Sequence, residues 1–286
     1  MPALQLTYKA FAVAGGAGGI GAMITKALLA QGAEVNVLSR STSIVVPQGA
    51  TVKKVDYTDA GSLSSALQGV QVVVSALSQG GFAYQPALAD AAKAAGVQLF
   101  VPSEYGSPTH DLPSTSLLYF KPQLQQHLRK IGLPYTLYYT GWFSDFTFIQ
   151  PFGYDIPNKT LTIVGPGTKP VSFASREDVA HFMAYTLTHL STEKLENATF
   201  GVEGDRLSLL ELRKVFEDVY GGYFKLVHRD VAEVEKVVEA KREAAFVEYI
   251  QLMAAYGDVL IEKPDNALVP GWKPLTVPES LRKFYS

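Results

Sequence analysis

A run of glycines near the N-terminus has the composition of a phosphate-binding turn. Residues Gly15-Gly16-Ala17-Gly18-Gly19-Ile20-Gly21 can be read as G-x-x-G-x-x-G from Gly15 or as G-x-G-x-x-G from Gly16. Both spacings put phosphate groups at the same turn, because glycines let the backbone approach a pyrophosphate closely. The start of a following helix would add free N–H groups and the positive end of its dipole. A glycine-rich surface loop is the alternative.

The segments around this run have the lengths of a βαβ unit. Residues 10–14 are apolar and long enough for one buried strand, and residues 34–39 have a second strand pattern. Between them, apolar residues recur at helical spacing from Ile20 to Leu28, and Gly32 stands where that helix would stop. The unit spans roughly thirty residues, the length that a parallel crossover needs. This context favours a dinucleotide-binding turn over a surface loop.

The second strand ends in Ser39-Arg40-Ser41, which indicates the type of dinucleotide. An NAD site usually has Asp or Glu at this point to hold the ribose hydroxyls, but Glu34 lies at the opposite end of the strand. A guanidinium group instead suits a 2′-phosphate, with which it forms charge-assisted hydrogen bonds. A solvated surface arginine is the alternative. We therefore expect NADP.

Composition narrows the function classes. The 286 residues suffice for one large or two modest domains. Lys and Arg number 25 against 27 Asp and Glu, with no basic block, so nucleic-acid binding has little support. Thiol catalysis is excluded by the lack of cysteine, and five scattered histidines predict no metal site. Apolar runs are only strand-length and the N-terminus resembles no leader, so we expect a soluble cytoplasmic protein.

Strand and helix patterns alternate through the first half of the chain and predict an α/β fold with a doubly wound parallel sheet. Further strands are expected at residues 51–56, 70–76, 97–101 and 134–139, with helices at 63–67, 86–95 and 121–130. We expect residues 1–152 to form a Rossmann domain and residues 153–286 a smaller α+β substrate lobe. The chain is expected to return to the sheet around residues 171–202.

Local patterns also predict parts of the second half. Residues 161–164 and the turn at 165–167 suggest a hairpin, and residues 230–256 read as one long amphipathic helix. Capping-box patterns begin at Ser175 and Ser208, and Thr276 with Glu279 caps a last helix.

The sequence resembles the isoflavone-reductase-like and NmrA-like branch of the atypical short-chain dehydrogenases/reductases. The resemblance is carried by the glycine run, the strand ending at Arg40, and the segments at residues 56–70, 91–106 and 121–136. It implies an NADP-binding Rossmann domain with a substrate lobe. It also implies NADPH-dependent reduction of small aromatic or unsaturated compounds, although regulators that bind dinucleotides and protein partners without turnover belong to the same branch.

Lys121 matches a lysine of the family's reductases, and the resemblance implies that it is catalytic and lies beside the nicotinamide. A buried lysine there could hold ribose hydroxyls or donate a proton to the substrate; an ordinary surface lysine is the alternative. Proline is tolerated only in the first helical turn, so Pro122 predicts that a helix begins near Lys121 or is kinked there.

A tyrosine four residues before the lysine is missing, because Leu117 occupies that position. This departure disfavours a nucleotide-sugar epimerase or dehydratase. Tyr105 or Tyr138 could supply a hydroxyl from another strand end, although buried tyrosines more often serve packing. Ser103 follows a strand at the end where open α/β sheets bind ligands, but as a turn residue it needs no function.

The expected cofactor contacts combine the glycine run with the strand ends of the resemblance. They are Gly15, Gly16, Ala17, Gly18, Gly19, Ile20, Gly21, Ser39, Arg40, Asp56, Tyr57, Ala76, Leu77, Ser78, Pro102, Ser103 and Lys121. For the substrate we expect contacts from Tyr105, Trp142 and Phe143; the aromatic residues Phe146, Phe148, Phe152 and Tyr154 extend the same stretch. The sequence thus favours a reductase of small aromatic or unsaturated carbonyl or alkene compounds over a dinucleotide sensor.

Overall fold

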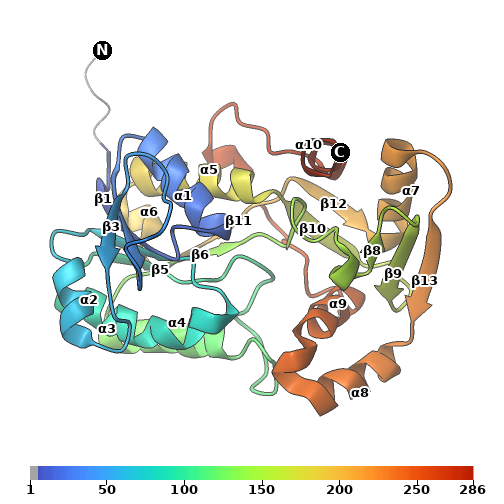
Figure 1. Ribbon diagram of the computed structural model, residues 1–286, viewed down its shortest axis with the longest axis horizontal. Coiled ribbons are helices and arrows are strands. Elements are labelled where there is room, and N and C mark those ends of the chain that lie inside the picture. Colours follow the sequence, from blue (N-terminus) through green and yellow to red (C-terminus); the bar gives the residue numbers. More distant parts are fainter. Residues whose placement is uncertain (1–5, 286) are drawn as a thin grey trace.

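The computed structural model describes residues 6–285, with a parallel sheet on the left of Figure 1 and smaller sheets on the right. Strands and helices alternate through its first half. In chain order they are β1 (Ala10–Ala14), α1 (Gly19–Ala30), β2 (Glu34–Ser39), β3 (Thr51–Lys54), α2 (Ala60–Ala66), β4 (Val72–Ser75), η1 (Gln79–Tyr84), α3 (Gln85–Ala94), β5 (Leu99–Val101), α4 (Phe120–Ile131) and β6 (Thr136–Tyr139). The expected strands and helices are all present, with ends that differ by a few residues.

The main sheet has the strand order β3-β2-β1-β4-β5, and every pairing in it is parallel. A bridge between Phe100 and Tyr135 continues the sheet toward β6, which pairs in parallel with β11 (Ala198–Gly201). The strand order reverses between β1 and β4, and ligands of open α/β sheets bind at such a switch point. The predicted doubly wound α/β fold is confirmed.

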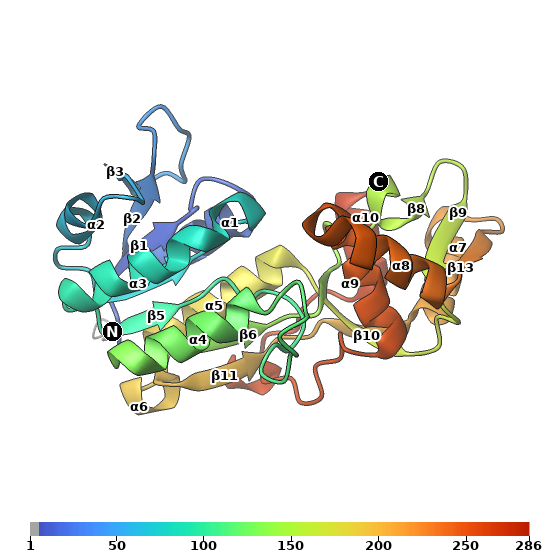
Figure 2. The same ribbon diagram turned by 90° about the horizontal axis from the view of Figure 1, so that it is seen from below.

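Each strand of this sheet sends alternate side chains to its two faces. Phe11 and Val13 of β1 pack in a cluster with α1 and α5 (Arg176–His189), whereas Ala12 and Ala14 pack in a second cluster with α2, α3 and α4. Figure 2 shows α3 and α4 on the near side of the sheet. Both faces are covered by helices, so the free edge for a ligand is the carboxyl end of the strands.

Most of the remaining elements form two three-stranded sheets with helices around them. These elements are β7 (Trp142–Phe143), η2 (Gln150–Phe152), β8 (Tyr154–Asp155), β9 (Thr160–Val164), β10 (Pro170–Ala174), β12 (Asp205–Ser208), α7 (Leu209–Tyr220), β13 (Lys225–Arg229), α8 (Val231–Lys241), η3 (Arg242–Ala245), α9 (Phe246–Tyr256) and α10 (Val277–Phe284). Helix α6 (Thr192–Leu195) and turn η4 (Asn266–Leu268) instead contribute Leu195 and Leu268 to the cluster of the main sheet. The sheets have the orders β12-β10-β7 and β13-β9-β8. The domain boundary at residue 152 stays a prediction.

The expected hairpin around residues 165–167 is wrong. Strand β9 pairs antiparallel with β8, which precedes it, and parallel with β13, while β10 pairs with β7 and β12. Gly165 and Gly167 both have φ near +68°, a conformation that glycine adopts without strain. They turn the chain out of one sheet and into the other, so the glycines mark a crossing between sheets.

The single long helix expected over residues 230–256 is also wrong. Helix α8 ends at Lys241, Arg242 has φ +48°, and a short 3₁₀ turn leads into α9. The break lets α9 fold back on α8, where Val234, Val238 and Leu252 join one apolar cluster. Residues 242–245 are good helix formers, so tertiary packing and not low helix propensity explains why the helix breaks here.

The predicted helix starts agree with the structure. Ser208 and Glu211 form a reciprocal capping box at α7, and Thr276 and Glu279 form another at α10. Ser175 caps α5 by accepting a hydrogen bond from the N–H of Asp178. These caps satisfy N–H groups that a helix leaves unpaired.

Candidate active site

A cleft of about 730 Å³ lies at the carboxyl ends of the parallel strands. Many of the expected site residues line it: Gly15, Gly18, Gly19, Ile20, Arg40, Tyr57, Ala76, Leu77, Ser78, Ser103, Tyr105, Lys121, Trp142 and Phe143. They come from the strand ends of the main sheet, the start of α4 and the segment after β6. One cavity therefore joins the glycine turn, Lys121 and the first aromatic residues of the smaller sheets.

The glycine turn divides into packing positions and open positions. A Cβ atom at Gly15 would lie 2.6 Å from the carbonyl oxygen of Ala76, and one at Gly21 would lie 2.2 Å from that of Gly15. A Cβ atom at Gly18 or Gly19 would meet nothing within 4 Å. Gly18 is the N-cap of α1 and has no side chain, so the cap residue itself gives the first N–H groups of α1 no side-chain partner. This geometry suits a pyrophosphate.

An aromatic pair stands beside Arg40. The ring of Tyr57 stacks on that of Tyr84 with centroids 5.4 Å apart, and its hydroxyl donates to the Leu38 carbonyl at 3.2 Å. Burial raises the pKa of Tyr57 to about 12, against the opposing effect of Arg40. Arg40 itself is exposed on the cleft, where its guanidinium is free to meet a ligand phosphate.

Other expected cofactor residues lie outside the cleft lining: Gly16, Ala17, Gly21, Ser39, Asp56 and Pro102. The Asp56 carboxylate accepts hydrogen bonds from the N–H and hydroxyl of Thr58, which lower its pKa. The Ser39 hydroxyl oxygen accepts from the N–H of Ser41. Both side chains thus have local partners in the turns that follow their strands.

Lys121 is buried, with 7% of its surface exposed, although it lies in the first turn of α4. Its ammonium donates to the Glu104 carbonyl oxygen and lies 3.5 Å from Oε2 of the Glu104 carboxylate. Burial lowers the pKa of Lys121, and the Glu104 charge opposes this effect. Helix α4 begins at Phe120, so Pro122 falls in the first turn; of the two expected outcomes, the helix starts here.

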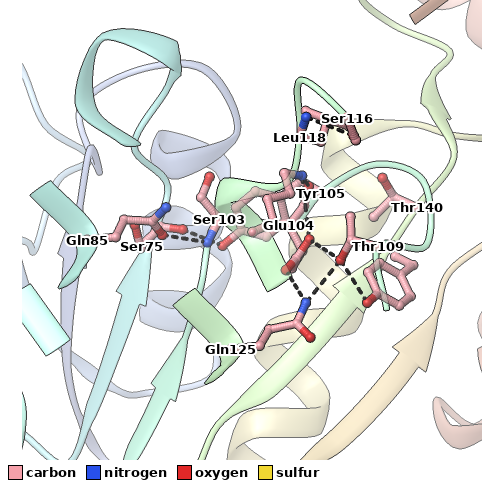
Figure 3. Close-up of polar contacts among 12 residues, drawn as sticks. Ser75, Gln85, Ser103, Glu104, Tyr105, Thr109, Ser116, Leu118, Gln125 and Thr140 are labelled. Carbon is pink, nitrogen blue, oxygen red and sulfur yellow. Dashed lines mark hydrogen bonds and ion pairs between the residues drawn. The ribbon is translucent and has the colours of Figure 1, made fainter. Parts of the chain in front are cut away.

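The Glu104 carboxylate is held by a buried hydrogen-bond network (Figure 3). Its Oε1 accepts from Nε2 of Gln125 at 2.8 Å, and its Oε2 accepts from the Thr109 hydroxyl at 3.1 Å. The Thr109 oxygen also accepts from Gln125 at 3.0 Å and lies 3.1 Å from the Tyr139 hydroxyl. Since Thr109 has one hydroxyl proton, its donation to Glu104 requires Tyr139 to donate to Thr109. The donors therefore converge on the two carboxylate oxygens of Glu104.

The candidate hydroxyl groups have structural partners. Ser103 donates to the Leu77 carbonyl at 2.9 Å, and Tyr105 donates to the Ser75 carbonyl at 2.9 Å. Burial raises the pKa of Tyr105. Tyr138 points to the face of the sheet that α5 covers, where its hydroxyl pairs with that of Thr186 at 2.9 Å in the core. Tyr138 is thus absent from the cleft lining, and Lys121 is the cleft's buried amine.

The aromatic stretch after β6 splits between cleft and core. Phe146 and Phe152 line the cleft beside Trp142 and Phe143, whereas Phe148 and Tyr154 are buried in the core of the smaller sheets. Phe246 and Ile250 of α9 line the cleft from a distant part of the sequence. The cleft therefore has a polar end at Lys121 and an apolar, aromatic wall.

Several lining residues were not expected from the sequence. They are Gly80, Gly81, Phe82, Tyr84, Glu104, Gly106, Ser107, Leu118, Gly141, Thr147, Arg176, Phe246 and Ile250. Glu104 stands inside the segment that carries the family resemblance, so its charge next to Ser103 was a usable signal. Arg176 and the α9 residues gave no local signal, because their position depends on how distant strands and helices pack.

Within residues 6–285, no three His, Cys, Asp or Glu side chains gather closely enough to hold a metal ion. No helix in the same range is both long and apolar enough to span a bilayer.

The family model described as NmrA-like matches residues 7–270. The chain belongs to the NmrA-like family. It is 34% identical over 220 residues to Oxidoreductase BOA1 of Botryotinia fuckeliana, covering 69% of this chain and 71% of that one. It is 32% identical over 241 residues to pinoresinol reductase 1 of Arabidopsis thaliana, covering 73% and 74%. The resemblance inferred from the sequence is confirmed.

Solved structures agree with the NmrA-like fold. AtPrR2 with NADP+ and (+)pinoresinol superposes with a TM-score of 0.81 at 24% identity, covering 97% of this chain and 99% of that chain. At this identity the similarity establishes the shared fold, and the chemistry has to be argued from the residues of this chain.

Proposed function

We propose that this NmrA-like protein is an NADPH-dependent reductase that acts on a carbonyl group or an activated double bond of a small aromatic or unsaturated substrate. The observation that carries the proposal is Lys121, a buried amine paired with Glu104 in a cleft that also contains the open glycine turn. The names of its relatives, an oxidoreductase and a pinoresinol reductase, support the reaction class.

The residues of the cleft fit a phosphorylated dinucleotide. The open backbone at Gly18 and Gly19, at the start of α1, suits the pyrophosphate, and the exposed Arg40 suits the 2′-phosphate. Among the residues that line the cleft, no carboxylate stands at the end of β2 to repel that phosphate. When bound, NADPH supplies the hydride.

Lys121 provides the electrostatic part of the reaction. Addition of hydride to a carbonyl carbon, or to the far carbon of an enone, leaves negative charge on the substrate oxygen. The Lys121 ammonium stabilises that charge and can transfer one proton to the oxygen. Hydride and proton together then give an alcohol from a carbonyl group, or an enol from an enone, which becomes the saturated ketone when its proton moves from oxygen to the alpha carbon. Glu104 holds the ammonium in place and favours its charged form despite burial.

The test is turnover. The protein is incubated with NADPH and a panel of enones, aryl ketones and phenylpropanoids, and loss of NADPH absorbance is followed together with product identity. Consumption of NADPH with formation of one reduced product per NADPH supports the reductase. Tight NADPH binding without consumption across the panel would contradict it and would favour the alternative, a dinucleotide sensor that acts through a protein partner.

A further inference from the structure

Two parallel strand ends bring an acid and a base together beside the aromatic wall. Strands β7 and β10 are parallel neighbours, with Phe143 opposite Ala174. Asp145 lies two residues after the end of β7, and Arg176 lies two residues after the end of β10. The carboxyl ends of neighbouring parallel strands meet at one edge of a sheet, which explains why the two side chains meet.

The contacts of this pair fix the arginine from one side. Nε of Arg176 donates to Oδ2 of Asp145 at 2.9 Å, the Arg176 backbone N–H donates to Oδ1 at 3.0 Å, and Nη2 lies 3.4 Å from the Asp145 carbonyl oxygen. The guanidinium carbon also lies 5.1 Å from the ring centre of Phe146. An arginine held in this way loses little further freedom when it binds a ligand.

The two charges differ in their access to the cleft. The Asp145 side chain is 1% exposed and does not line the cleft, whereas the Arg176 side chain is 21% exposed and does line it. A ligand in the cleft therefore meets the cation first, with its counter-ion behind it.

Donor groups of Arg176 remain after these contacts. A guanidinium has five N–H donors and no acceptor. The contacts with Asp145 use Nε and one N–H of Nη2, and within residues 6–285 no side chain or carbonyl accepts from Nη1. The contacts with Asp145 thus occupy the Nε–Nη2 edge of the guanidinium. The Nη1–Nη2 edge is left for a ligand, and its two N–H groups have the spacing at which a carboxylate accepts with both oxygens.

We propose that Arg176 is a specificity-determining residue that binds a carboxylate carried by the aromatic substrate. Phe143, Phe146 and Phe152 line the same part of the cleft and favour an aromatic body for that substrate. This inference rests on the proposed reductase function, and it narrows the substrate class to aromatic or unsaturated acids.

The test compares an acid with its neutral ester. Benzoylacrylate has an aryl ketone, an activated double bond and a carboxylate, and its methyl ester differs only in charge and in one methyl group. We expect kcat/KM to be about tenfold to a hundredfold higher for the acid, mainly through a lower KM, as for one charge-assisted contact. Equal kcat/KM for acid and ester in the unaltered protein would overturn the inference.

Variants assign the preference to Arg176. Arg176→Gln alone leaves the buried Asp145 charge uncompensated, so the double variant Asp145→Asn/Arg176→Gln is tested beside it. The acid preference should fall to near unity in both, with NADPH affinity unchanged. The matched control is Glu203→Gln/Arg206→Gln, since Nε of Arg206 pairs with Glu203 at 3.0 Å outside the cleft; it should keep the preference. Persistence of the preference in the double variant would exclude Arg176 as its source.

Binding separates this inference from the reaction itself. Dissociation constants of benzoylacrylate and its ester are measured on the NADP+-loaded protein through tryptophan fluorescence, because Trp142 lines the cleft. Arg176-dependent binding of the acid, together with no NADPH consumption on the acid or on the substrate panel, supports the inference and contradicts the reductase. Turnover of the ester equal to that of the acid supports the reductase and contradicts the inference.

Discussion

The Nζ atom of Lys121 lies 3.5 Å from Oε2 of Glu104, and both side chains are almost completely buried. Burial alone lowers the pKa of Lys121, because a desolvated ammonium is costly, while the neighbouring carboxylate raises it. Gln125 and Thr109 each donate a hydrogen bond to the same carboxylate. Burial and the Glu104 charge, one loop away in the chain, therefore act on the pKa of Lys121 in opposite directions, and burial has the larger effect.

Glu104→Gln should shift the pH dependence of the reaction. The substitution removes the charge that raises the pKa of Lys121, so the ammonium form is lost at a lower pH. The alkaline limb of the kcat profile should move to lower pH, so kcat should fall more at alkaline pH than at acidic pH. The measurement is kcat against pH for both proteins.

A matched control for this shift is Glu203→Gln. Glu203 also pairs with a basic side chain, Arg206, but lies outside the cleft lining. The alkaline limb of the kcat profile of the Glu203→Gln variant should coincide with that of the unaltered protein. A Glu104→Gln enzyme that loses activity equally at every pH would show that Glu104 serves only folding. If the charge of Glu104 matters, Glu104→Asp should keep the alkaline limb closer to its position in the unaltered protein than Glu104→Gln does.

Lys121→Ala should lower kcat by about a hundredfold, the scale of one lost electrostatic or general-acid contribution. NADPH affinity should change much less, because the charge that Lys121 stabilises develops only during the reaction. Single-turnover rates and NADPH titrations measure the two effects separately. Lys93→Ala is the control, since Lys93 donates to the Gly132 carbonyl away from the cleft. A fall in NADPH affinity with an unchanged rate would indicate that Lys121 only holds the cofactor.

Much of the fold could be read from local patterns. The βαβ unit, the alternation of strands and helices, and the caps at Ser208 and Thr276 all depend on residues close together in the sequence. The two errors, the hairpin at residues 165–167 and the unbroken helix over residues 230–256, arose where partners come from far along the chain. Strand β9 pairs with β13 instead of with the following strand β10, and α9 folds back on α8.

The candidate site was predictable to a similar extent. Lys121 and Arg40 stand in segments with a recognisable local context, and both line the cleft. The pairing of Lys121 with Glu104 could not be read from the sequence, because it joins the loop after β5 to the start of α4. The same holds for Arg176, whose place in the cleft depends on the pairing of β7 with β10.

Arg40→Ala should weaken NADPH binding by about tenfold to a hundredfold, corresponding to one charge-assisted contact with the 2′-phosphate. NADH lacks that phosphate, so its affinity should hardly change. Calorimetric titration of both cofactors measures the difference. Arg213→Ala is the control, because Arg213 pairs with Glu217 on α7 outside the cleft. Equal affinity of the unaltered protein for NADPH and NADH would contradict a role of Arg40 in cofactor choice.

Two glycines of the same turn should respond differently to substitution. A Cβ atom at Gly18 meets nothing within 4 Å, so Gly18→Val should fold with a near-normal Tm, yet lose NADPH binding because the side chain fills the space of the pyrophosphate. A Cβ atom at Gly21 would lie 2.2 Å from the Gly15 carbonyl oxygen, so Gly21→Ala should lower the Tm even without cofactor. Thermal unfolding with and without NADPH distinguishes the two effects. A Gly18→Val protein that NADPH still stabilises would remove the turn from the cofactor site.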